Sequence, residues 1–478
     1  MGGGTPSRIA WPPLEYGGGA GAPSRSDLEF EVRFSGALIN GTPVTGSPGQ
    51  YTFTVPFGTH DIEIRAFVRP GTTTNSTAFR SHYGIGRASG INIPGQGSAP
   101  VPITMQRAGD SAANPFMIYN EFQLRRVGRG GVNPLGFQHW TLGSHYRLID
   151  DITLTGGDWE PIGPVFSGSF NGGGFSIGGL TINNTTLNDS GMFAENSGTI
   201  ENLNLPGVNI TNNAWGHHGS VAGVNNLGIV RRITVSGNVS AFATGVFGGV
   251  VGFNTGTVEN SDFTGTISVD APAGGVVGHN WGTVERSSFS GTLSSNTSSH
   301  AGGVVAFNFG GTVTNNRSSG TVSGLAHVGG VVGHNDGIVQ NSFSLSTVSA
   351  IDHSAGGLAG SHLLGTIQNS VALNQSITRS SGGDTHFARL YGNNTLGTGT
   401  NNHARAGMVF IDGAIPQPDF PVPVVSDPTG FHGADVSPGT HPSQFNNQSF
   451  WETTLGWDFT NIWQMQGSPP LPALRPPQ

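Results

Sequence analysis

Residues 248–267 read GGVVGFNTGTVENSDFTGTI, and close relatives of this stretch begin at Gly274, Gly302 and Gly329. One asparagine recurs at intervals of 29, 29, 26, 28 and 27 residues. It stands at Asn196, Asn225, Asn254, Asn280, Asn308 and Asn335. A unit of this size cannot bury its own apolar face, so such a regular period predicts units that stack on one another. The stretch therefore predicts a solenoid.

Alignment of the units on the asparagine brings aliphatic residues into three columns. The columns contain Val230, Val258, Val284, Val313, Val339 and Ile367; Val239, Ile267, Leu293, Val322 and Val348; and Val221, Val250, Val276, Val304, Val331 and Leu358. Short β-branched runs separated by Gly and Asn favour strands. We predict a right-handed parallel β-helix of about 27 residues per coil, with coils stacked about 4.8 Å apart.

The six asparagines are predicted to form a structural ladder. Asn tolerates the left-handed backbone conformation of a turn, and its amide can bond to the same amide in the next coil. We expect the ladder to support the fold and to take no part in chemistry.

Composition excludes several classes of function. The 478 residues include no Cys, and all 20 basic residues are Arg, so thiol, lysine Schiff-base and P-loop chemistry are excluded. The net charge is -8 with no basic patch, which argues against nucleic acid. No run is long enough for a membrane span, and the opening MGGGTPSR does not have the pattern of a signal peptide.

The pattern along the chain predicts five parts. Residues 1–26 are a flexible Gly- and Pro-rich tether, and residues 27–110 are a small antiparallel β-sandwich with immunoglobulin-like architecture. Residues 111–145 form an N-terminal helical cap, with Asn120 capping a short helix. Residues 146–405 are the parallel β-helix. Residues 406–478 combine a Pro-rich segment with an aromatic cap at the end of the solenoid.

The repeat resembles the GLUG repeat of bacterial surface and secreted proteins. Similar segments continue outside it, as YRLIDDITLTGGDWEPIG (residues 146–163), FSGSFNGGGFSIGGLTI (166–182) and NNQSFWETTLGWDFTNIW (446–463). The unit that follows Asn335 departs from the pattern, because His362 replaces the asparagine, and the register beyond it is left open. The resemblance implies an extracellular or cell-surface β-solenoid, often linked to adhesion and sometimes appended to surface peptidases.

Several polar groups are candidate sites. Asp150, Asp151, Asp158 and Glu160 could supply paired acids, but Asp commonly closes turns. His300 and His327 fall at matching places in adjacent coils, with Asp352 or His353 as a third ligand. Glu201, Arg231, Glu259 and Glu285 are expected to form an exposed charge ladder. His217 and His218 are adjacent, but no HExxH motif accompanies them. We predict no catalytic residue, no cofactor and no metal.

The leading hypothesis is a secreted or surface-displayed structural and adhesive solenoid without enzymatic activity. It would bind host or environmental glycans or proteins, or copies of itself through the N-terminal tail or the solenoid ends to form a fibre or layer. The alternative is a carbohydrate-binding or carbohydrate-cleaving β-helix, in which Trp215 and Trp281 are the tryptophans of the regular coils. A third is an ice- or crystal-binding surface made by columns of hydroxyls. These columns are Thr266, Thr292, Thr321 and Thr347, and Ser268, Ser294, Ser323 and Ser349.

Overall fold

The computed structural model describes most of the chain. The described residues are 7–10, 27–38, 50–51, 58–72, 78–93, 103–104, 106–132, 136–184, 188–242, 245–297, 300–380, 387–413, 415–417 and 430–476. Among the described residues, strands account for 55% and helix for 3%. The chain divides into two compact units, the first made of residues 1–150 and 168–170 and the second of residues 151–167 and 171–478.

The first unit contains a five-stranded antiparallel sheet in the order β3-β2-β5-β6-β8. Its strands are β2 (Leu28–Phe34), β3 (Ala37–Leu38), β5 (Gly58–Val68), β6 (Ser81–Ile93) and β8 (Gln106–Arg107). Alternate residues of β2 and β5 are buried, among them Val32, Ile62 and Ile64. The prediction of a small antiparallel domain is confirmed, although β6 was missed because its Gly-rich sequence lacks the alternating apolar pattern.

A second, smaller sheet accompanies it. Three short strands, β1 (Ser7–Ala10), β4 (Gln50–Tyr51) and β7 (Ile103–Thr104), pair in the order β4-β1-β7. Strand β1 falls within the predicted tether, so four of its residues are paired backbone rather than free chain. The rest of residues 1–26 lies outside the described residues.

The predicted helix is α1 (Glu121–Leu124), and it is only one turn long. The Asn120 side chain accepts a hydrogen bond from the Gln123 backbone N–H at 3.0 Å, which is the expected N-cap. Strand β9 (Phe116–Ile118) pairs in parallel with β10 (His145–Leu148) in the same unit.

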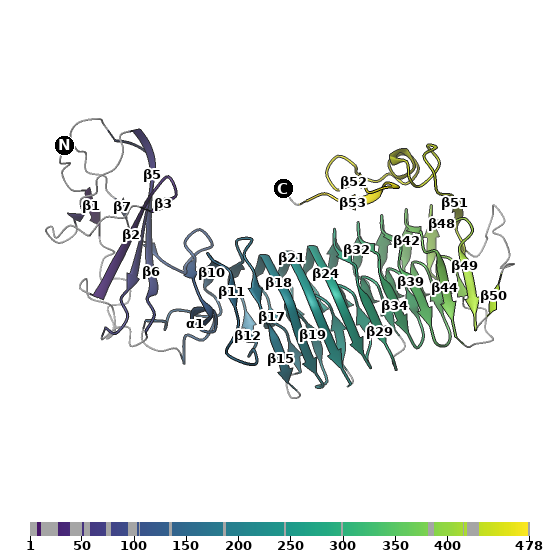
Figure 1. The fold of residues 1–478 in the computed structure, drawn as a ribbon, viewed down its shortest axis with the longest axis horizontal. Helices are drawn as coiled ribbons and strands as arrows, with labels where there is room; N and C mark the ends of the chain where they lie inside the picture. The colour runs from purple at the N-terminus through teal and green to yellow at the C-terminus, as the bar shows by residue number, and fades with distance from the viewer. Residues whose placement is uncertain are drawn as a thin grey trace. The chain divides into compact units, whose positions relative to one another are not determined.

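The second unit is a parallel β-solenoid of about 10 turns with about 28 residues per coil, which confirms the predicted fold (Figure 1). Three sheets run along it. Most strands of the first end in asparagine, so we call it the asparagine sheet: β12 (Ile162–Phe166), β17 (Phe193–Asn196), β20 (Ala222–Asn225), β23 (Val251–Asn254), β26 (Val277–Asn280), β31 (Val305–Asn308), β36 (Val332–Asn335), β41 (Ala359–His362) and β46 (Tyr391–Asn394).

The second sheet, here the glycine sheet, has shorter strands: β16 (Asp189–Ser190), β19 (His217–Gly219), β22 (Val246–Gly248), β25 (Ala273–Gly274), β30 (Ala301–Gly302), β35 (Val328–Gly329), β40 (Ala355–Gly356) and β45 (Phe387–Ala388). The predicted column at Val276 lies at the corner between β25 and β26, buried but outside either strand.

The third sheet, here the long sheet, contains strands of 13 or 14 residues in its early coils, and later coils divide the equivalent run into three strands. Its strands are β13 (Ser169–Asn171) at the boundary of the units, β15 (Thr181–Asn184), β18 (Thr199–Asn212), β21 (Ile229–Ala241), β24 (Thr257–Val269), β27 (Thr283–Glu285), β28 (Ser288–Phe289), β29 (Thr292–Ser295), β32 (Thr312–Thr314), β33 (Arg317–Ser318), β34 (Thr321–Gly324), β37 (Ile338–Gln340), β38 (Phe343–Ser344), β39 (Thr347–Ala350), β42 (Thr366–Gln368), β43 (Val371–Ala372), β44 (Ser376–Arg379), β47 (Thr398–Thr400), β48 (His403–Arg405), β49 (Val409–Asp412), β50 (Ile415–Gln417) and β51 (Ala434–Val436). The pair β11 (Ile152–Thr153) and β14 (Ile177–Gly178) adds a short parallel sheet.

The six asparagines form a continuous buried column. Each Nδ2 donates to the Oδ1 of the next asparagine, at 2.7 Å from Asn196 to Asn225 and 2.8 Å from Asn280 to Asn308. Asn280 also donates to the Gly282 carbonyl at 3.1 Å. A Cβ at Gly282 would lie 2.1 Å from the Gly256 carbonyl oxygen of the preceding coil, so glycine is required where this turn packs.

The reason given for the asparagines was wrong, because none of the six has a positive φ. The left-handed residues form a separate column on the long sheet: Asn202, Arg232, Asn260, Arg286, Asn315, Asn341, Asn369 and Asn401, with φ between 47° and 57°. Most are Asn, which tolerates this conformation. The repeated Asn-Ser of residues 260–261 and 341–342 was the available signal.

The register continues beyond the last ladder asparagine. His362 occupies the asparagine position, and its Nδ1 lies 3.3 Å from Asn335 Nδ2. Strand β41 then pairs with β46, His362 opposite Asn394. An imidazole nitrogen can accept the hydrogen bond that an amide oxygen accepts elsewhere, so the substitution ends the asparagine ladder without disturbing the coil.

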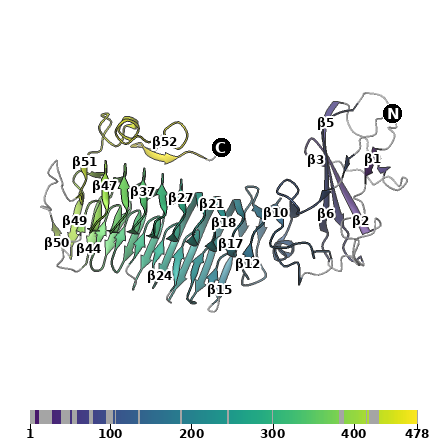
Figure 2. The same cartoon turned by 180° about the vertical axis from the view of Figure 1, so that it is seen from behind.

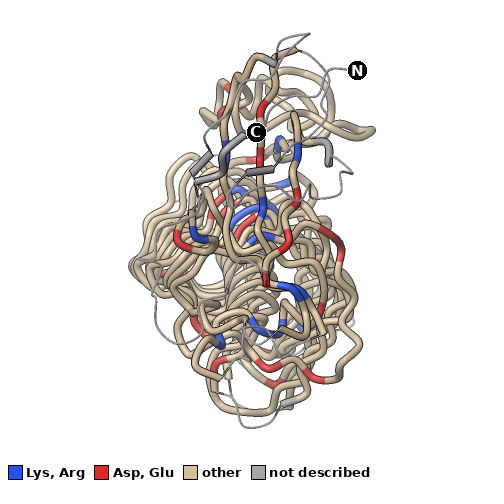
Figure 3. Tube along the Cα trace, turned by 90° about the vertical axis from the view of Figure 1, so that its left-hand side faces the viewer, with Lys and Arg blue, Asp and Glu red and all other residues tan. Residues whose placement is uncertain are grey.

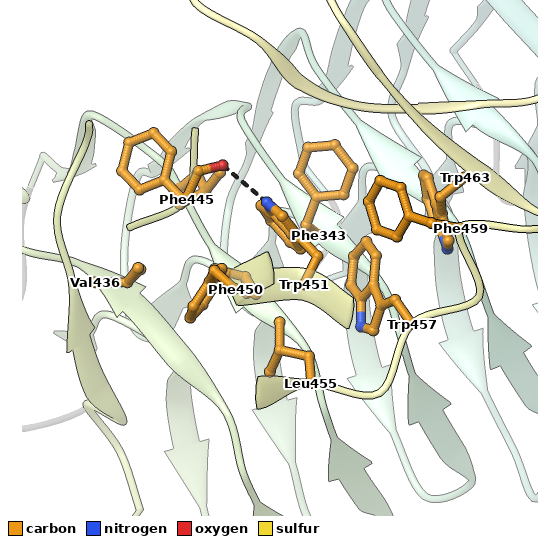
Figure 4. Close-up of a cluster of buried hydrophobic side chains, with 11 residues drawn as sticks. Phe343, Val436, Phe445, Phe450, Trp451, Leu455, Trp457, Phe459 and Trp463 are labelled. Carbon is orange, nitrogen blue, oxygen red and sulfur yellow. Dashed lines mark hydrogen bonds between the residues drawn. The ribbon is translucent and has the colours of Figure 1, made fainter. Parts of the chain in front are cut away.

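The C-terminal segment, residues 430–476, folds back along the side of the solenoid (Figure 2). Its π-helical turn Phe450–Thr454 and hairpin β52 (Trp463–Gln466) and β53 (Leu471–Leu474) carry aromatic side chains that bury Phe343, Val371 and Leu373 (Figure 4). Phe343 and Val371 occupy the position that the half-buried Arg317 occupies one coil before Phe343. These later coils therefore present apolar side chains at an outer position, and the C-terminal segment covers them.

This arrangement differs from the predicted aromatic end cap. The residues that precede the aromatic cluster in the chain cover the last coil instead. The Leu390 backbone N–H donates to the Phe431 carbonyl at 2.9 Å, and β51 pairs with β48. Among the described residues no helix has the length and apolar character needed to cross a membrane.

Replacement of Asn280 by Leu is expected to lower the free energy of unfolding by about 1–3 kcal/mol, because the neighbouring amides lose buried partners. Urea denaturation would measure the change. Asn296→Leu, at an exposed turn, is the matched control. Equal stability of the two variants would contradict a supporting role for the ladder.

Replacement of Trp457 by Ala is expected to cost about 3–5 kcal/mol, the usual range for a buried tryptophan. Its ring is buried against Trp451 and Trp463, and its Nε1 donates to the Asn369 carbonyl at 2.9 Å. Trp281→Ala, at a side chain that is 59% exposed, is the control. Thermal unfolding checks both, and a Trp457→Ala variant as stable as the control would refute the covering role.

Candidate functional site

One outer side of the solenoid carries a continuous surface of rings, which we call the aromatic–histidine face. It consists of His217, Phe253, His279, Trp281, His300, Phe307, Phe309, His327 and His334. Parallel register produces it, because Phe253, His279, Phe307 and His334 occupy the same strand position in successive coils of the asparagine sheet. Their neighbours on the strand are the buried asparagines, so alternation along the strand turns the rings outward.

Two further columns widen the face. Trp281 and Phe309 directly follow the ladder asparagines of adjacent coils, and their ring centroids lie 5.7 Å apart. His300 and His327 precede strands β30 and β35 of the glycine sheet and stack at 4.8 Å. Phe307 joins the columns, 4.2 Å from His300 and 5.2 Å from Phe309. The result is a surface that extends from coil to coil along the solenoid axis.

Burial keeps two of the imidazoles neutral. Desolvation lowers the pKa of His279 to about 4, with a smaller effect from His217. Desolvation also lowers the pKa of His300 to about 3, helped by neighbouring histidines. At neutral pH these rings therefore present aromatic faces and ring nitrogens without a positive charge.

Carboxylates hold other histidines of the face in place. His217 Nδ1 lies 2.9 Å from Asp189 Oδ1, and this hydrogen bond is the main cause of the lowered pKa of Asp189. His334 Nε2 lies 3.0 Å from Asp336 Oδ2. The charged groups at the edge of the face are thus acidic, on a chain in which charges are sparse (Figure 3).

A pocket of about 480 Å³ adjoins the face near β19 and β26. Trp215, His217, Asp270, His279 and Thr297 supply its aromatic and polar lining. Trp215 is 70% exposed. The combination of an exposed ring with convergent polar groups is typical of ligand sites.

The groups singled out from the sequence have other roles. Asp151 Oδ1 accepts the Ser176 backbone N–H at 2.7 Å, which is the turn-closing use of Asp, and Asp158 and Glu160 are exposed. The predicted charge ladder is present, but its groups are half-buried rather than exposed. Arg231 pairs with Glu201 at 2.7 Å, and Arg286, which lies outside the predicted set, pairs with Glu259 at 2.6 Å. Desolvation, reinforced by Glu259, raises the pKa of Glu285.

The predicted histidine alignment is correct, but it forms part of an aromatic surface. His300 and His327 stack, whereas Asp352 pairs with its neighbour His353 at 3.3 Å. No group of three His, Cys, Asp or Glu within the described ranges is arranged to hold a metal. His218 is buried, with Ser190 Oγ 3.0 Å from its Nδ1 and the Ala214 carbonyl 3.1 Å from its Nε2.

The hydroxyl columns are in register as expected. The threonines are exposed, but Ser294 Oγ lies 3.0 Å from Ser323 Oγ, so serine hydroxyls bond to one another within their column.

Most of the aromatic–histidine face was missed from the sequence. The signal was present as the residue before each of the last four ladder asparagines, which alternates Phe253, His279, Phe307 and His334. The outward ring column becomes visible only when the position beside the ladder is compared between coils.

Comparison with known proteins shows what the fold resembles. No family model matches the chain. No curated protein matches it. A crystal structure of a Bacteroides ovatus protein to which immunoglobulin A1 protease activity is attributed is similar over 77% of this chain and 94% of its own, with 16% identity and a TM-score of 0.41. An IgA1 protease structure is similar over 80% of this chain and 29% of its own, with 14% identity and a TM-score of 0.32.

These neighbours correct one prediction. The sequence predicted a protein without enzymatic activity. Both similar structures are named as proteases, which contradicts that prediction. Likeness at these TM-scores assigns no activity to this chain. What the fold establishes is a β-solenoid.

The half-buried His279 and His300 predict a loss of stability in acid. In the unfolded chain they titrate near pH 6.5, whereas the pKa values of His279 and His300 are lowered to about 4 and about 3. Their contribution is therefore complete above pH 6.5 and is lost as the pH falls towards 4, by up to about 1.4 kcal/mol per pH unit for each group.

Denaturant unfolding at pH 7.5 and pH 4.5 would measure the loss, and His300→Gln is expected to reduce it. His441→Gln, at an exposed position, is the control. A His300→Gln variant with the pH dependence of the parent protein would show that this ring does not resist protonation.

Proposed function

We propose that the protein is an extracellular or cell-surface adhesive β-solenoid that binds a polysaccharide along its aromatic–histidine face. The observation that carries the proposal is the continuity of the rings from coil to coil. Phe253, His279 and Phe307 repeat at one strand position, so similar contacts recur about every 4.8 Å along the axis. A linear polymer of similar units suits such a surface.

The chemistry of the rings favours sugars. A sugar ring offers C–H faces and hydroxyl edges, and aromatic faces with nearby hydrogen-bonding groups match both. Phe307 and Phe309 supply apolar faces, and neutral imidazoles such as His279 can donate and accept hydrogen bonds.

Charge narrows the class of polysaccharide. The face is bordered by Asp189 and Asp336, each bonded to a histidine of the face. An acidic polymer would meet these carboxylates with like charge. We infer that the ligand is neutral or cationic.

Location and assembly are also proposals. The resemblance to GLUG-repeat proteins supports membership of that group and a position outside the cell, where a polysaccharide would be met. Assembly of copies through residues 1–26 stays a prediction, since those residues other than Ser7–Ala10 lie outside the described part of the chain.

The test is the double variant Phe307→Ala/Phe309→Ala, in native gels that contain hydroxyethylcellulose, arabinoxylan, glycol chitosan or alginate. We expect the parent protein to be retarded by a neutral or cationic polymer and not by alginate. The double variant should bind at least about fivefold more weakly, since aromatic contacts contribute about 0.5–1.5 kcal/mol each and 1.4 kcal/mol is tenfold.

Thr321→Ala/Thr347→Ala, on the long sheet, is the matched control and should bind like the parent. Absence of retardation by every polymer would refute the proposal. So would sedimentation showing that the face instead pairs two copies and that the double variant only separates them.

A further inference from the structure

The pocket beside Trp215 has features that neither the stacking of coils nor the rest of the face explains. Trp215 is 70% exposed and borders the pocket together with His217 and His279. A single exposed apolar side chain needs no explanation by itself. An exposed tryptophan at the rim of a 480 Å³ pocket can form one wall for a flat ligand.

Asp270 supplies the charge of the pocket. Its backbone is fixed, because its N–H donates to the Ala241 carbonyl and its own carbonyl accepts the Thr297 hydroxyl, both at 3.1 Å. Its carboxylate, in contrast, has no hydrogen bond or ion pair with any described residue. The side chain is half-buried, so a carboxylate is held at the pocket without a protein partner.

The other lining groups do not offset this charge. No Arg lines the pocket, and the chain has no Lys. His217 is bonded to Asp189, and His279 is neutral at neutral pH. The pocket therefore favours a ligand with a positive group, which would pair with the Asp270 carboxylate in a charge-assisted hydrogen bond.

The pocket is continuous with the aromatic–histidine face. His217 and His279 belong to both, and their ring centroids lie 6.0 Å apart. A polymer lying along the face would reach the pocket at its β19 end. One unit of the chain can then enter while the remaining units stay on the rings.

We propose, on the basis of the function proposed above, that this pocket binds a sugar unit with a free amino group. The sugar ring stacks on Trp215, and its ammonium group pairs with Asp270. The pocket thus selects amino sugars within the class of neutral and cationic polysaccharides. Trp215 and Asp270 determine this specificity, whereas the other rings provide general affinity.

The experiment compares two ligands with the same backbone, the hexamer of glucosamine and the hexamer of N-acetylglucosamine. Isothermal titration of the full chain, at a pH where the free amine is protonated, should show tighter binding of the glucosamine hexamer. Asp270→Asn should lower the ratio of the two affinities about fivefold, because the change weakens binding of the glucosamine hexamer more than binding of the acetylated hexamer. Added salt should reduce the preference in the parent protein only.

Two further variants separate the contributions. Trp215→Ala should weaken both hexamers severalfold. Trp281→Ala, on the face but outside the pocket, should weaken both and leave the ratio between them intact. Asp270→Asn is a near-isosteric change of a half-buried side chain, and far-UV circular dichroism checks that each variant is folded.

The outcomes distinguish the two proposals. If Asp270→Asn keeps the preference, or if the parent protein has none, the amino-sugar pocket is wrong. If Phe307→Ala/Phe309→Ala weakens binding while Trp215→Ala does not, the pocket proposal fails and the polysaccharide-binding face stands. If the parent protein binds neither hexamer nor any polymer in the gels, both proposals fail.

Discussion

Hydrogen bonding between coils is the constraint on which the rest of this structure depends. A coil of about 28 residues is too short to enclose a core, so its backbone donors and acceptors are satisfied by the coils above and below. The asparagine ladder extends the same principle to side chains inside the coil. Asn254, for example, donates to Asn280 and to the carbonyl of Gly256 within its own turn. Each amide thus bonds to the next coil and fixes the turn that follows its own strand.

The same register that satisfies the backbone also builds the outer surface. Equivalent positions of successive coils lie directly above one another, so a residue type that recurs at one position of the repeat forms a column along the solenoid. Inside, this gives the ladder, and outside it gives both the charge ladder of Arg231 and Glu259 and the ring column of His279 and Phe307. A binding surface for a long ligand requires no separate scaffold, because the strands that fold the protein also position the rings.

The sequence predicted the solenoid because its repeats can be aligned with one another, and this alignment shows the period and the aliphatic columns. It also predicted which positions align, as the pairing of Asn254 with Asn280 shows. It did not predict which backbone positions are left-handed: the conformation falls on Asn260 and Arg286, where side-chain type alone is ambiguous. Nor did it predict the path of the C-terminal segment. Trp457 could pack on an end or a side, and the choice depends on the apolar patch around Phe343.

The candidate site was hidden for a related physical reason. The aliphatic interior columns keep one class of side chain, since each side chain packs against its equivalents, whereas the exterior column alternates chemistry. Phe253, His279, Phe307 and His334 alternate between hydrocarbon and imidazole and so look variable in an alignment of the repeats. Yet a neutral, partly desolvated imidazole packs like a small aromatic ring while keeping two nitrogens for hydrogen bonds. Alternation of Phe with His therefore keeps the aromatic surface continuous and adds polar groups at intervals, a pattern that matches the proposed polymer with apolar faces and hydroxyl edges.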